Sequence, residues 1–275
     1  MQPTIARALA TAQLDAVDAR ALLRPACGCD EAYLVAHAND KLSPAQSAQY
    51  AALVARRAAG EPVAYIVGTR EFFSLAFKVT PAVLIPRPET ELLVEIALER
   101  IAPDHEASVL DLGTGSGCIA IAIARHRPRA RVVAIDRSAA ALAVARENSA
   151  RHHAANLELR RGDWFSNLGA ERFDLIVANP PYVAACDPHL QSGDLRAEPV
   201  DALSAGEDGL KCLRAIVAAA PVHLNNGGVL AVEHGYDQAP RCRELLEAAG
   251  LEELFSRTDI AGIARVSGGA WRGQG

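Results

Sequence analysis

The sequence has 275 residues, 50% of them apolar and 22% charged, which is the composition of a globular protein with one large or two modest domains. The formal net charge of −5 gives no electrostatic case for nucleic acid as the main partner. No apolar run reaches the roughly 18 residues of a membrane span, and the N-terminus lacks a secretion-signal pattern, so we expect a cytoplasmic protein without membrane contact.

The cysteines predict neither a metal centre nor a disulfide framework. The chain has six, at positions 27, 29, 118, 186, 212 and 242. Cys27 and Cys29 are close in sequence, but no second pair of Cys or His residues has the spacing of a zinc site. We therefore expect no bound metal, and reduced thiols of the kind found in the cytoplasm.

The N-terminal part of the chain has helical periodicity. Apolar residues recur every three or four positions in three segments, residues 4–14, 30–40 and 43–60. The last segment starts with a Ser-Pro pair and stops at a glycine, which are signals for the start and the end of a helix. These segments predict a small helical domain over residues 1–62.

A linker is predicted over residues 63–87. Residues 62–80 alternate apolar and polar types and are rich in β-branched and aromatic residues, which predicts a β-hairpin. Residues 81–90 form a connector interrupted by prolines, and a predicted helix over residues 89–102 follows it.

The remainder, residues 88–275, alternates strand and helix patterns. Repeated βα units imply a mostly parallel sheet with helices on both faces, which is an α/β fold. The tail after Ser267 is rich in glycine, and it is the one place where we expect disorder. The predicted strands cover residues 108–113, 131–136, 157–163, 173–181, 227–235, 251–257 and 264–267.

Three polar or glycine-rich groups follow predicted strands. The glycine-rich stretch 111–117 follows the first strand, Asp136 the second, and the sequence Asn-Pro-Pro-Tyr of residues 179–182 the fourth. In an open α/β sheet, ligands bind beyond the carboxyl ends of the strands, so these groups should meet at one edge. The sequence therefore predicts a ligand site there.

The first two groups favour a ligand that contains adenosine. Gly113, Gly115 and Gly117 have the spacing G-x-G-x-G, and the third glycine of a dinucleotide fingerprint is replaced by Cys118. Asp136 ends a strand where a carboxylate can accept both ribose hydroxyls. The absence of the third glycine and of a phosphate clamp argues against NAD and ATP. A tight turn at the glycines and a solvated helix cap at Asp136 are the alternatives.

The basic stretch of residues 125–131 has no place in this site. It follows the first helix of the α/β part, which runs antiparallel to its strand and ends at the opposite edge of the sheet. Arginines near the C-terminus of a helix also interact favourably with the helix dipole. A structural role is therefore favoured over nucleic-acid binding.

The Asn-Pro-Pro-Tyr sequence predicts a holder for a planar NH2 group. Asn179 offers a side-chain carbonyl, and Pro180, held extended by the proline after it, offers its backbone carbonyl. Two adjacent acceptors match the two hydrogens of an NH2 group. Tyr182 supplies a flat surface on which a planar amide or a base edge can stack. An ordinary turn is the alternative.

These motifs resemble those of S-adenosylmethionine-dependent methyltransferases that act on planar NH2 groups. The similarity narrows to the HemK/PrmC family with the segments GEPVAYIVGTREFFSL, LIPRPETELLVE, GDWF and VEHG and with the loop after Asn-Pro-Pro-Tyr. Enzymes of that family methylate the side-chain nitrogen (N5) of the glutamine in the Gly-Gly-Gln motif of class I peptide chain release factors.

The resemblance implies a fold, a cofactor and a set of site residues. The fold would be a Rossmann-like, seven-stranded class I methyltransferase domain after an N-terminal helical domain that docks the substrate. The cofactor would be S-adenosyl-L-methionine, with S-adenosyl-L-homocysteine as product. Arg87 and Glu89 would order the connector over the cofactor, with ordinary helix-start chemistry as the alternative. We assign no role to the end of the chain around Trp271.

The implied site residues fall into two overlapping sets. The cofactor would be bound by Gly113, Thr114, Gly115, Ser116, Gly117, Asp136, Asp163, Trp164 and Asn179. The substrate amide would be bound by Asn179, Pro180, Pro181 and Tyr182, of which Asn179, Pro180 and Tyr182 are the predicted catalytic residues.

Two other functions stay open at this point. A DNA or RNA methyltransferase acting on adenine N6 or guanine N2 would meet the same planar NH2 group, but it needs a basic cleft and usually a target-recognition domain. Residues 1–85 are nearly neutral, with 8 Lys and Arg against 7 Asp and Glu. A binding protein that no longer transfers methyl is opposed by the intact site motifs.

Overall fold

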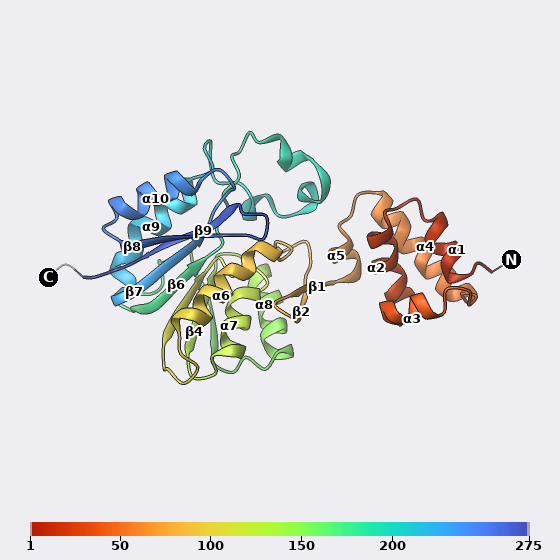
Figure 1. The fold of residues 1–275 in the computed structure, drawn as a ribbon, viewed down its shortest axis with the longest axis horizontal. Helices are drawn as coiled ribbons and strands as arrows, with labels where there is room; N and C mark the ends of the chain where they lie inside the picture. The colour runs from red at the N-terminus through yellow and green to blue at the C-terminus, as the bar shows by residue number, and fades with distance from the viewer. Residues whose placement is uncertain (1, 274–275) are drawn as a thin grey trace. The chain divides into compact units, whose positions relative to one another are not determined.

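The computed structural model describes residues 2–273 (Figure 1). Contacts divide the chain into two compact units: Met1–Thr69 with Ser192–Ala197, and Arg70–Gln191 with Glu198–Gly275. We call them the helical unit and the α/β unit. Among the residues described, no helix is long and apolar enough to cross a bilayer.

The helical unit has its own apolar core. Asp15 caps the second helix by accepting hydrogen bonds from two backbone N–H groups, and Ser43 and Gln46 form a reciprocal capping box at the fourth. Leu22 and Leu23 are fully buried between the helices. The helices are α1 (Ile5–Thr11), α2 (Ala16–Cys27), α3 (Glu31–Ala36), α4 (Pro44–Ala58) and α5 (Val63–Val67).

The predicted hairpin over residues 62–80 was wrong in its first part. Residues Val63–Val67 form the helix α5, which ends at Gly68 in the left-handed conformation with φ of 78°. The hairpin is shorter and consists of β1 (Thr69–Phe72) and β2 (Leu75–Lys78). A five-residue apolar run does not distinguish a helical turn from a strand by periodicity, and the glycine is the only local helix signal.

The α/β unit contains a seven-stranded mixed sheet in the order β5-β4-β3-β6-β7-β9-β8, as the Rossmann-like prediction required. Strands β3 to β7 are parallel, and β9 runs antiparallel to β7 and β8. The strands are β3 (Ser108–Leu112), β4 (Arg131–Asp136), β5 (Leu157–Arg161), β6 (Phe173–Ala178), β7 (Leu224–Glu233), β8 (Glu252–Thr258) and β9 (Ala264–Ala270).

Helices cover both faces of the sheet (Figure 1). Alternate residues of β3 enter opposite apolar layers: Val109 packs with α6 and α7, and Leu110 packs with α9 and α10. Burial on both faces explains why the central strands are apolar throughout. The helices are α6 (Glu91–Arg100), α7 (Cys118–His126), α8 (Ala139–Arg151), α9 (Lys211–His223) and α10 (Ala239–Ala248), with short 3-10 turns η1 (Pro88–Thr90), η2 (Pro188–Gln191) and η4 (Val200–Ala202). The turn η3 (Gly193–Ala197) belongs to the helical unit.

The expected disorder after Ser267 was wrong for the residues that follow directly. Strand β9 continues to Ala270, and the Trp271 N–H donates to the Gly228 carbonyl at 2.8 Å. A Cβ on Gly268 would lie 2.2 Å from the carbonyl oxygen of Leu230. Close strand packing therefore explains this glycine, and it does not signal flexibility.

Candidate functional site

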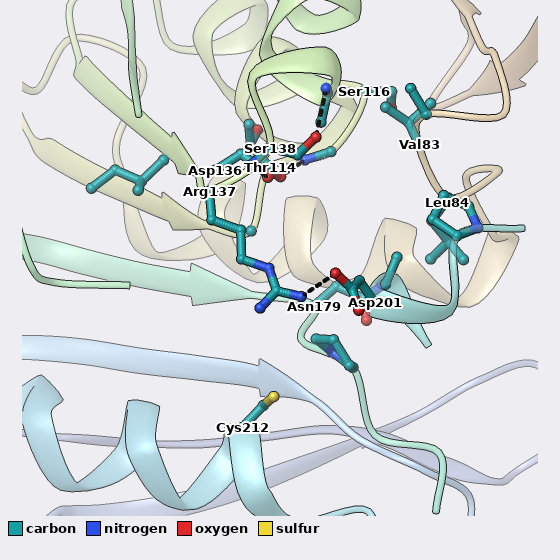
Figure 2. A pocket seen from close by; sticks show the side chains of 18 of the residues that line it. Val83, Leu84, Thr114, Ser116, Asp136, Arg137, Ser138, Asn179, Asp201 and Cys212 are labelled. Carbon is teal, nitrogen blue, oxygen red and sulfur yellow. Dashed lines mark hydrogen bonds and ion pairs between the residues drawn. The ribbon is translucent and has the colours of Figure 1, made fainter. Parts of the chain in front are cut away.

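A pocket of about 610 Å³ lies in the α/β unit, at the carboxyl ends of β3, β4 and β6 (Figure 2). The order of the strands reverses beside β3, which is where doubly wound sheets bind ligands. Of the predicted site residues, the pocket is lined by Gly113, Thr114, Gly115, Ser116, Asp136, Asp163, Trp164, Asn179 and Pro181. Gly117, Pro180 and Tyr182 are not part of its lining.

The glycine-rich turn after β3 needs its glycines for two different reasons. Gly113 has a φ of 75°, and a Cβ there would contact the indole ring of Trp164 at 3.4 Å. A Cβ on Gly117 would lie 2.9 Å from Ile121 and 3.3 Å from Ala145. Gly113 is therefore favoured by its left-handed backbone, beside a ring that a Cβ would just touch, whereas Gly117 lets α7 pack closely on α8.

Asp136, at the end of β4, is bonded to the glycine-rich turn and can still accept hydrogen bonds from a ligand. Its Oδ2 accepts a hydrogen bond from the Gly115 N–H at 2.9 Å, and its Oδ1 accepts one from the Ser138 N–H at 2.8 Å. Each carboxylate oxygen has a further lone pair, and the residue lines the pocket. The cap of α8 is Ser138, whose hydroxyl accepts from the Ala141 N–H, so Asp136 is not the helix cap that was the alternative to a ligand role.

A second carboxylate, Asp111, is buried beneath this turn. The hydroxyl of Thr114 donates to its Oδ2 at 2.6 Å, and its Oδ1 has no hydrogen-bond partner within residues 2–273. Burial raises the pKa of Asp111 to about 7; the bond from Thr114 opposes the rise, and the charge of Asp136 adds to it. Between about pH 4 and about pH 7, the buried carboxyl group of Asp111 therefore keeps a proton that an exposed aspartate would lose.

Trp164 forms one wall of the pocket. The residue has a φ of 48°, which few non-glycine residues adopt, and its ring lies against Gly113. The tight turn after Asp163 is closed by a bond from the Asp163 N–H to the Ser166 hydroxyl at 3.0 Å. This turn holds the indole ring in the lining of the pocket.

The Asn-Pro-Pro-Tyr segment begins directly after β6. The Asn179 side chain donates from Nδ2 to the Thr90 hydroxyl at 3.0 Å, so its Oδ1 is the atom left to accept a hydrogen bond from a ligand. Pro180 is buried, and Tyr182 is held at both ends. Its hydroxyl donates to Glu233 at 3.2 Å, and its carbonyl accepts from the Gln238 amide at 3.0 Å.

Glu233 is a fully buried carboxylate at the end of β7 that the sequence analysis did not single out. Its Oε1 accepts from Tyr182, and its Oε2 has no hydrogen-bond partner among the residues described. Burial raises the pKa of Glu233 to about 7, and the interactions with Thr90 and Tyr182 oppose that rise. The feature of the sequence that could have identified Glu233 is its position: it is an acidic residue at the end of a predicted strand, at the edge of the sheet where the ligand site was predicted.

Glu198 ties the connector to the loop that follows the Asn-Pro-Pro-Tyr segment. Its fully buried carboxylate accepts from the Ile85 N–H at 3.0 Å and forms an ion pair with Arg87. Arg87 of the connector is thereby paired with a residue of this loop, a partner that the sequence analysis did not foresee. Arg137 and Asp201, which both line the pocket, form an exposed ion pair at 2.9 Å (Figure 2).

A glycine in the same loop fits closely against Tyr182. Gly209 has a φ of 72°, and a Cβ there would lie 2.4 Å from the Tyr182 carbonyl oxygen and 2.8 Å from the Gln238 amide. Only a residue without a side chain permits this contact. The loop therefore supports the Asn-Pro-Pro-Tyr segment from behind, which the sequence did not reveal.

The basic stretch of residues 125–131 is engaged in structural contacts. Arg127 donates to the carbonyl of Ile101 at 2.5 Å, and Arg131 pairs with Glu171 at 2.7 Å. Arg131 begins β4, so the stretch lies at the sheet edge opposite the pocket. Within the described part of the chain, no group of three or more His, Cys, Asp or Glu residues is arranged to hold a metal.

The chain is similar to known methyltransferases along most of its length. Residues 88–193 match the Methyltransferase small domain family, and residues 4–68 match the PrmC N-terminal domain. A methyltransferase structure from Pyrococcus furiosus has a TM-score of 0.55 at 20% identity, covering 80% of this chain and 98% of that chain. This likeness concerns the fold alone.

Two curated relatives are much closer in sequence. The release factor glutamine methyltransferase of Burkholderia pseudomallei (strain K96243) is 51% identical over 272 residues, which are 97% of this chain and 95% of the relative. The release factor glutamine methyltransferase of Xylella fastidiosa (strain Temecula1) is 49% identical over 267 residues, 97% of both chains. Identity at this level over nearly the whole of both chains shows that this protein belongs to the HemK/PrmC family of release factor glutamine methyltransferases.

Proposed function

We propose that this protein transfers a methyl group from S-adenosyl-L-methionine to the side-chain amide nitrogen (N5) of the glutamine in the Gly-Gly-Gln motif of class I peptide chain release factors. The observation that carries the proposal is the 51% identity to a release factor glutamine methyltransferase over 97% of this chain. The lining of the pocket in the α/β unit supports it independently.

The residues that line the pocket suit the proposed cofactor in the chemistry of their donors and acceptors. Asp136 would accept from the ribose hydroxyls, and the Trp164 ring would lie against the flat adenine. Asp163 would accept from the adenine amino group. The cradle of Gly113–Gly117 has no large side chains and would hold the ribose and methionine parts. When bound, S-adenosylmethionine supplies a methyl carbon made electrophilic by the positive charge on sulfur.

The task left to the chain is to orient and activate an amide nitrogen. The lone pair of such a nitrogen is delocalised into its carbonyl group, so the nitrogen is a weak nucleophile. Asn179 Oδ1 is available to accept one of its N–H groups because Thr90 already takes the Asn179 Nδ2 hydrogen. The Pro180 carbonyl would accept the other N–H group.

Two acceptors on one nitrogen have two effects in this proposal. They make the nitrogen more electron-rich, and they fix its direction of approach. They also stabilise the positive charge that develops on nitrogen before a proton leaves to solvent. Tyr182, held by Glu233 and Gln238, would pack its ring beside the substrate amide. No covalent enzyme intermediate is needed.

The N-terminal part would hold the substrate protein in place. We assign residues 1–62 to substrate docking, residues 63–87 to the linker and residues 88–275 to methyl transfer. A release factor needs contacts beyond the three residues of its motif, and the helical unit has its own core on which such a surface can be built. We place the reaction in the cytoplasm, where class I release factors act.

The experiment that tests the function offers the purified protein several acceptors separately. Labelled S-adenosylmethionine is incubated with a class I release factor, tRNA, ribosomal RNA or DNA, and the labelled product is mapped by mass spectrometry. A release factor with the motif glutamine replaced by alanine is the matched control. Label on nucleic acid with an unmodified release factor would reject the proposal and support the base methyltransferase.

A further inference from the structure

Exposed apolar side chains of the α/β unit are concentrated at the edge of the sheet that carries the pocket. Within residues 2–273, the large apolar side chains of this unit that are exposed are Val200, Val222, Tyr236, Ile260 and Ile263. Val222 lies near the end of α9, just before β7 starts, and so at the opposite edge. The other four follow or precede strand ends on the ligand side. Single exposed apolar residues are ordinary, but several at one functional edge indicate a contact surface.

The Asn-Pro-Pro-Tyr segment has a partner on each side. The Val183 N–H donates to the Leu203 carbonyl at 2.9 Å, and the Tyr182 carbonyl accepts from Gln238 Nε2 at 3.0 Å. This N–H and this carbonyl belong to one trans peptide unit, so they point in opposite directions. The loop that contains η4 therefore lies on one side of the segment, and the turn that carries Gln238 lies on the other.

Each of these two neighbours presents an exposed apolar side chain. Val200 begins η4, is 67% exposed, and stands next to Pro199 and Asp201 in the pocket lining. Tyr236 is 70% exposed and lies inside the turn 235–238. Two bonds between Gly235 and Gln238 close this turn: backbone N–H to carbonyl at 3.0 Å, and backbone N–H to side-chain Oε1 at 2.9 Å. The backbone that carries the Tyr236 ring is therefore fixed at both ends.

The turn between β8 and β9 brings Ile260 and Ile263 to the same edge. The His234 N–H donates to the Arg265 carbonyl at 2.9 Å, so the residues just before β9 lie beside the end of β7. Asp259 makes this turn rigid. Its Oδ1 accepts from the Ala261 and Ile263 N–H groups at 2.9 and 3.0 Å, and its Oδ2 pairs with Arg265 at 2.9 Å. Ile260 is fully exposed on this rigid turn.

We propose that Val200, Tyr236, Ile260 and Ile263 form an apolar rim that contacts the substrate release factor next to its Gly-Gly-Gln loop; this inference rests on the proposed function. The glutamine can reach the Asn-Pro-Pro-Tyr segment only if the protein surface around its loop comes over this edge, and that surface then meets the rim. Tyrosine is among the residues that dominate binding energy at protein interfaces. Side chains on rigid turns also lose little conformational freedom on binding. The rim belongs to the α/β unit, so it adds to the docking that we assign to residues 1–62.

The kinetic test compares Tyr236→Ala with Val222→Ala, a matched control whose side chain is 63% exposed at the opposite edge. With a release factor as acceptor, Tyr236→Ala should raise KM by about tenfold, whereas kcat and the affinity for S-adenosylmethionine should change by less than about twofold. Tyr236→Phe keeps the ring and should recover most of the loss. An unchanged KM in Tyr236→Ala, or an equal rise in Val222→Ala, would overturn the inference.

A second test detects the contact without methyl transfer. The photoreactive residue p-benzoylphenylalanine replaces Tyr236, Ile260 or, as control, Val222, and each protein is illuminated with purified release factor. Adducts are mapped by mass spectrometry. We expect the replacements of Tyr236 and Ile260 to form adducts in the domain that carries the Gly-Gly-Gln loop, and the replacement of Val222 to form none. Adducts elsewhere on the release factor, or equal yields at all three positions, would overturn the inference.

The outcomes separate this inference from the proposed function. A wild-type protein that leaves release factors unmethylated would refute the proposed function. Normal methylation with an unchanged KM in Tyr236→Ala would refute the apolar rim alone. Sedimentation of the wild type and of Tyr236→Ala tests a second copy of this chain as the occupant. A wild-type dimer that dissociates in the variant would assign the rim to that second copy and overturn the inference, whereas a monomer in both agrees with it.

Discussion

The indole ring of Trp164 lies 3.4 Å from the place that a Cβ on Gly113 would take. The two residues are far apart in the sequence and come together because β3 ends beside the turn that carries the ring. The contact leaves the backbone of the glycine-rich turn and the face of the indole ring open to the same pocket.

Gly113→Ala should weaken the binding of S-adenosylmethionine by about tenfold, because the left-handed φ of 75° is unfavourable for alanine and the methyl group would come to the limit of van der Waals contact with the ring. Calorimetry with the purified variant measures the change. Gly169→Ala is the matched control, since Gly169 has a φ of 57° but no neighbour within 4 Å of its added Cβ. Equal affinities in the two variants would show that the contact with Trp164 is unimportant.

Asp136→Ala should weaken the binding free energy of S-adenosylmethionine by about 1.5–3 kcal/mol, the size expected for lost charge-assisted hydrogen bonds. The variant also loses the bonds that Asp136 accepts from Gly115 and Ser138. Asp104→Ala, which changes an exposed aspartate outside the pocket, serves as control. Unchanged cofactor affinity in Asp136→Ala would remove this residue from the site.

Gly209→Ala should lower kcat by about tenfold or more while cofactor affinity changes less, because the added methyl group would displace the Tyr182 carbonyl, 2.4 Å away. Steady-state kinetics with a release factor as acceptor gives the two parameters. Gly262→Ala has a similar φ of 77° and nothing within 4 Å, so it controls for backbone strain. A loss confined to cofactor binding would contradict the support that we assign to this loop.

Asp111→Asn should change how stability depends on pH. The pKa of Asp111 is raised from 3.8 to about 7, so between these values the folded state holds more protons than the unfolded state. The free energy of unfolding of the wild type should therefore fall as the pH rises from about 4 to about 7, by up to a few kcal/mol from this group. The variant lacks this contribution, so it should gain stability relative to the wild type as the pH rises.

Denaturant unfolding at about pH 5 and about pH 8, followed by tryptophan fluorescence, measures this difference. Both tryptophans of the chain, Trp164 and Trp271, lie in the α/β unit, so the signal reports the unit that contains Asp111. The same stability difference between variant and wild type at both pH values would mean that Asp111 ionises normally in the folded protein.

The edge of the sheet at which the pocket forms was predictable from the order of strands and helices in the sequence. Each parallel strand delivers the residue after it to the same edge, so Asp136 and Asn179 were placed there from strand positions alone. The central strands were likewise visible as apolar runs, whereas β5 and β8 carry several charged residues. Trp164 entered only through the resemblance to the family.

The bonds that support the site were not predictable from the sequence. Thr90 and Asn179 are 89 residues apart, and Tyr182 and Glu233 are 51 apart. No local pattern marks which polar residues meet across such distances. Glycines were ambiguous for a related reason: Gly268 indicated flexibility in the sequence, whereas in the structure it allows a close contact between strands.

The measurement that tests the central claim most directly is the mass and position of the methyl group on a class I release factor after reaction with this protein. We predict one added methyl group on the side-chain nitrogen of the Gly-Gly-Gln glutamine, with turnover reduced by about two to three orders of magnitude in Asn179→Ala. An unmodified glutamine, a methyl group elsewhere, or near-normal turnover in Asn179→Ala would contradict the account.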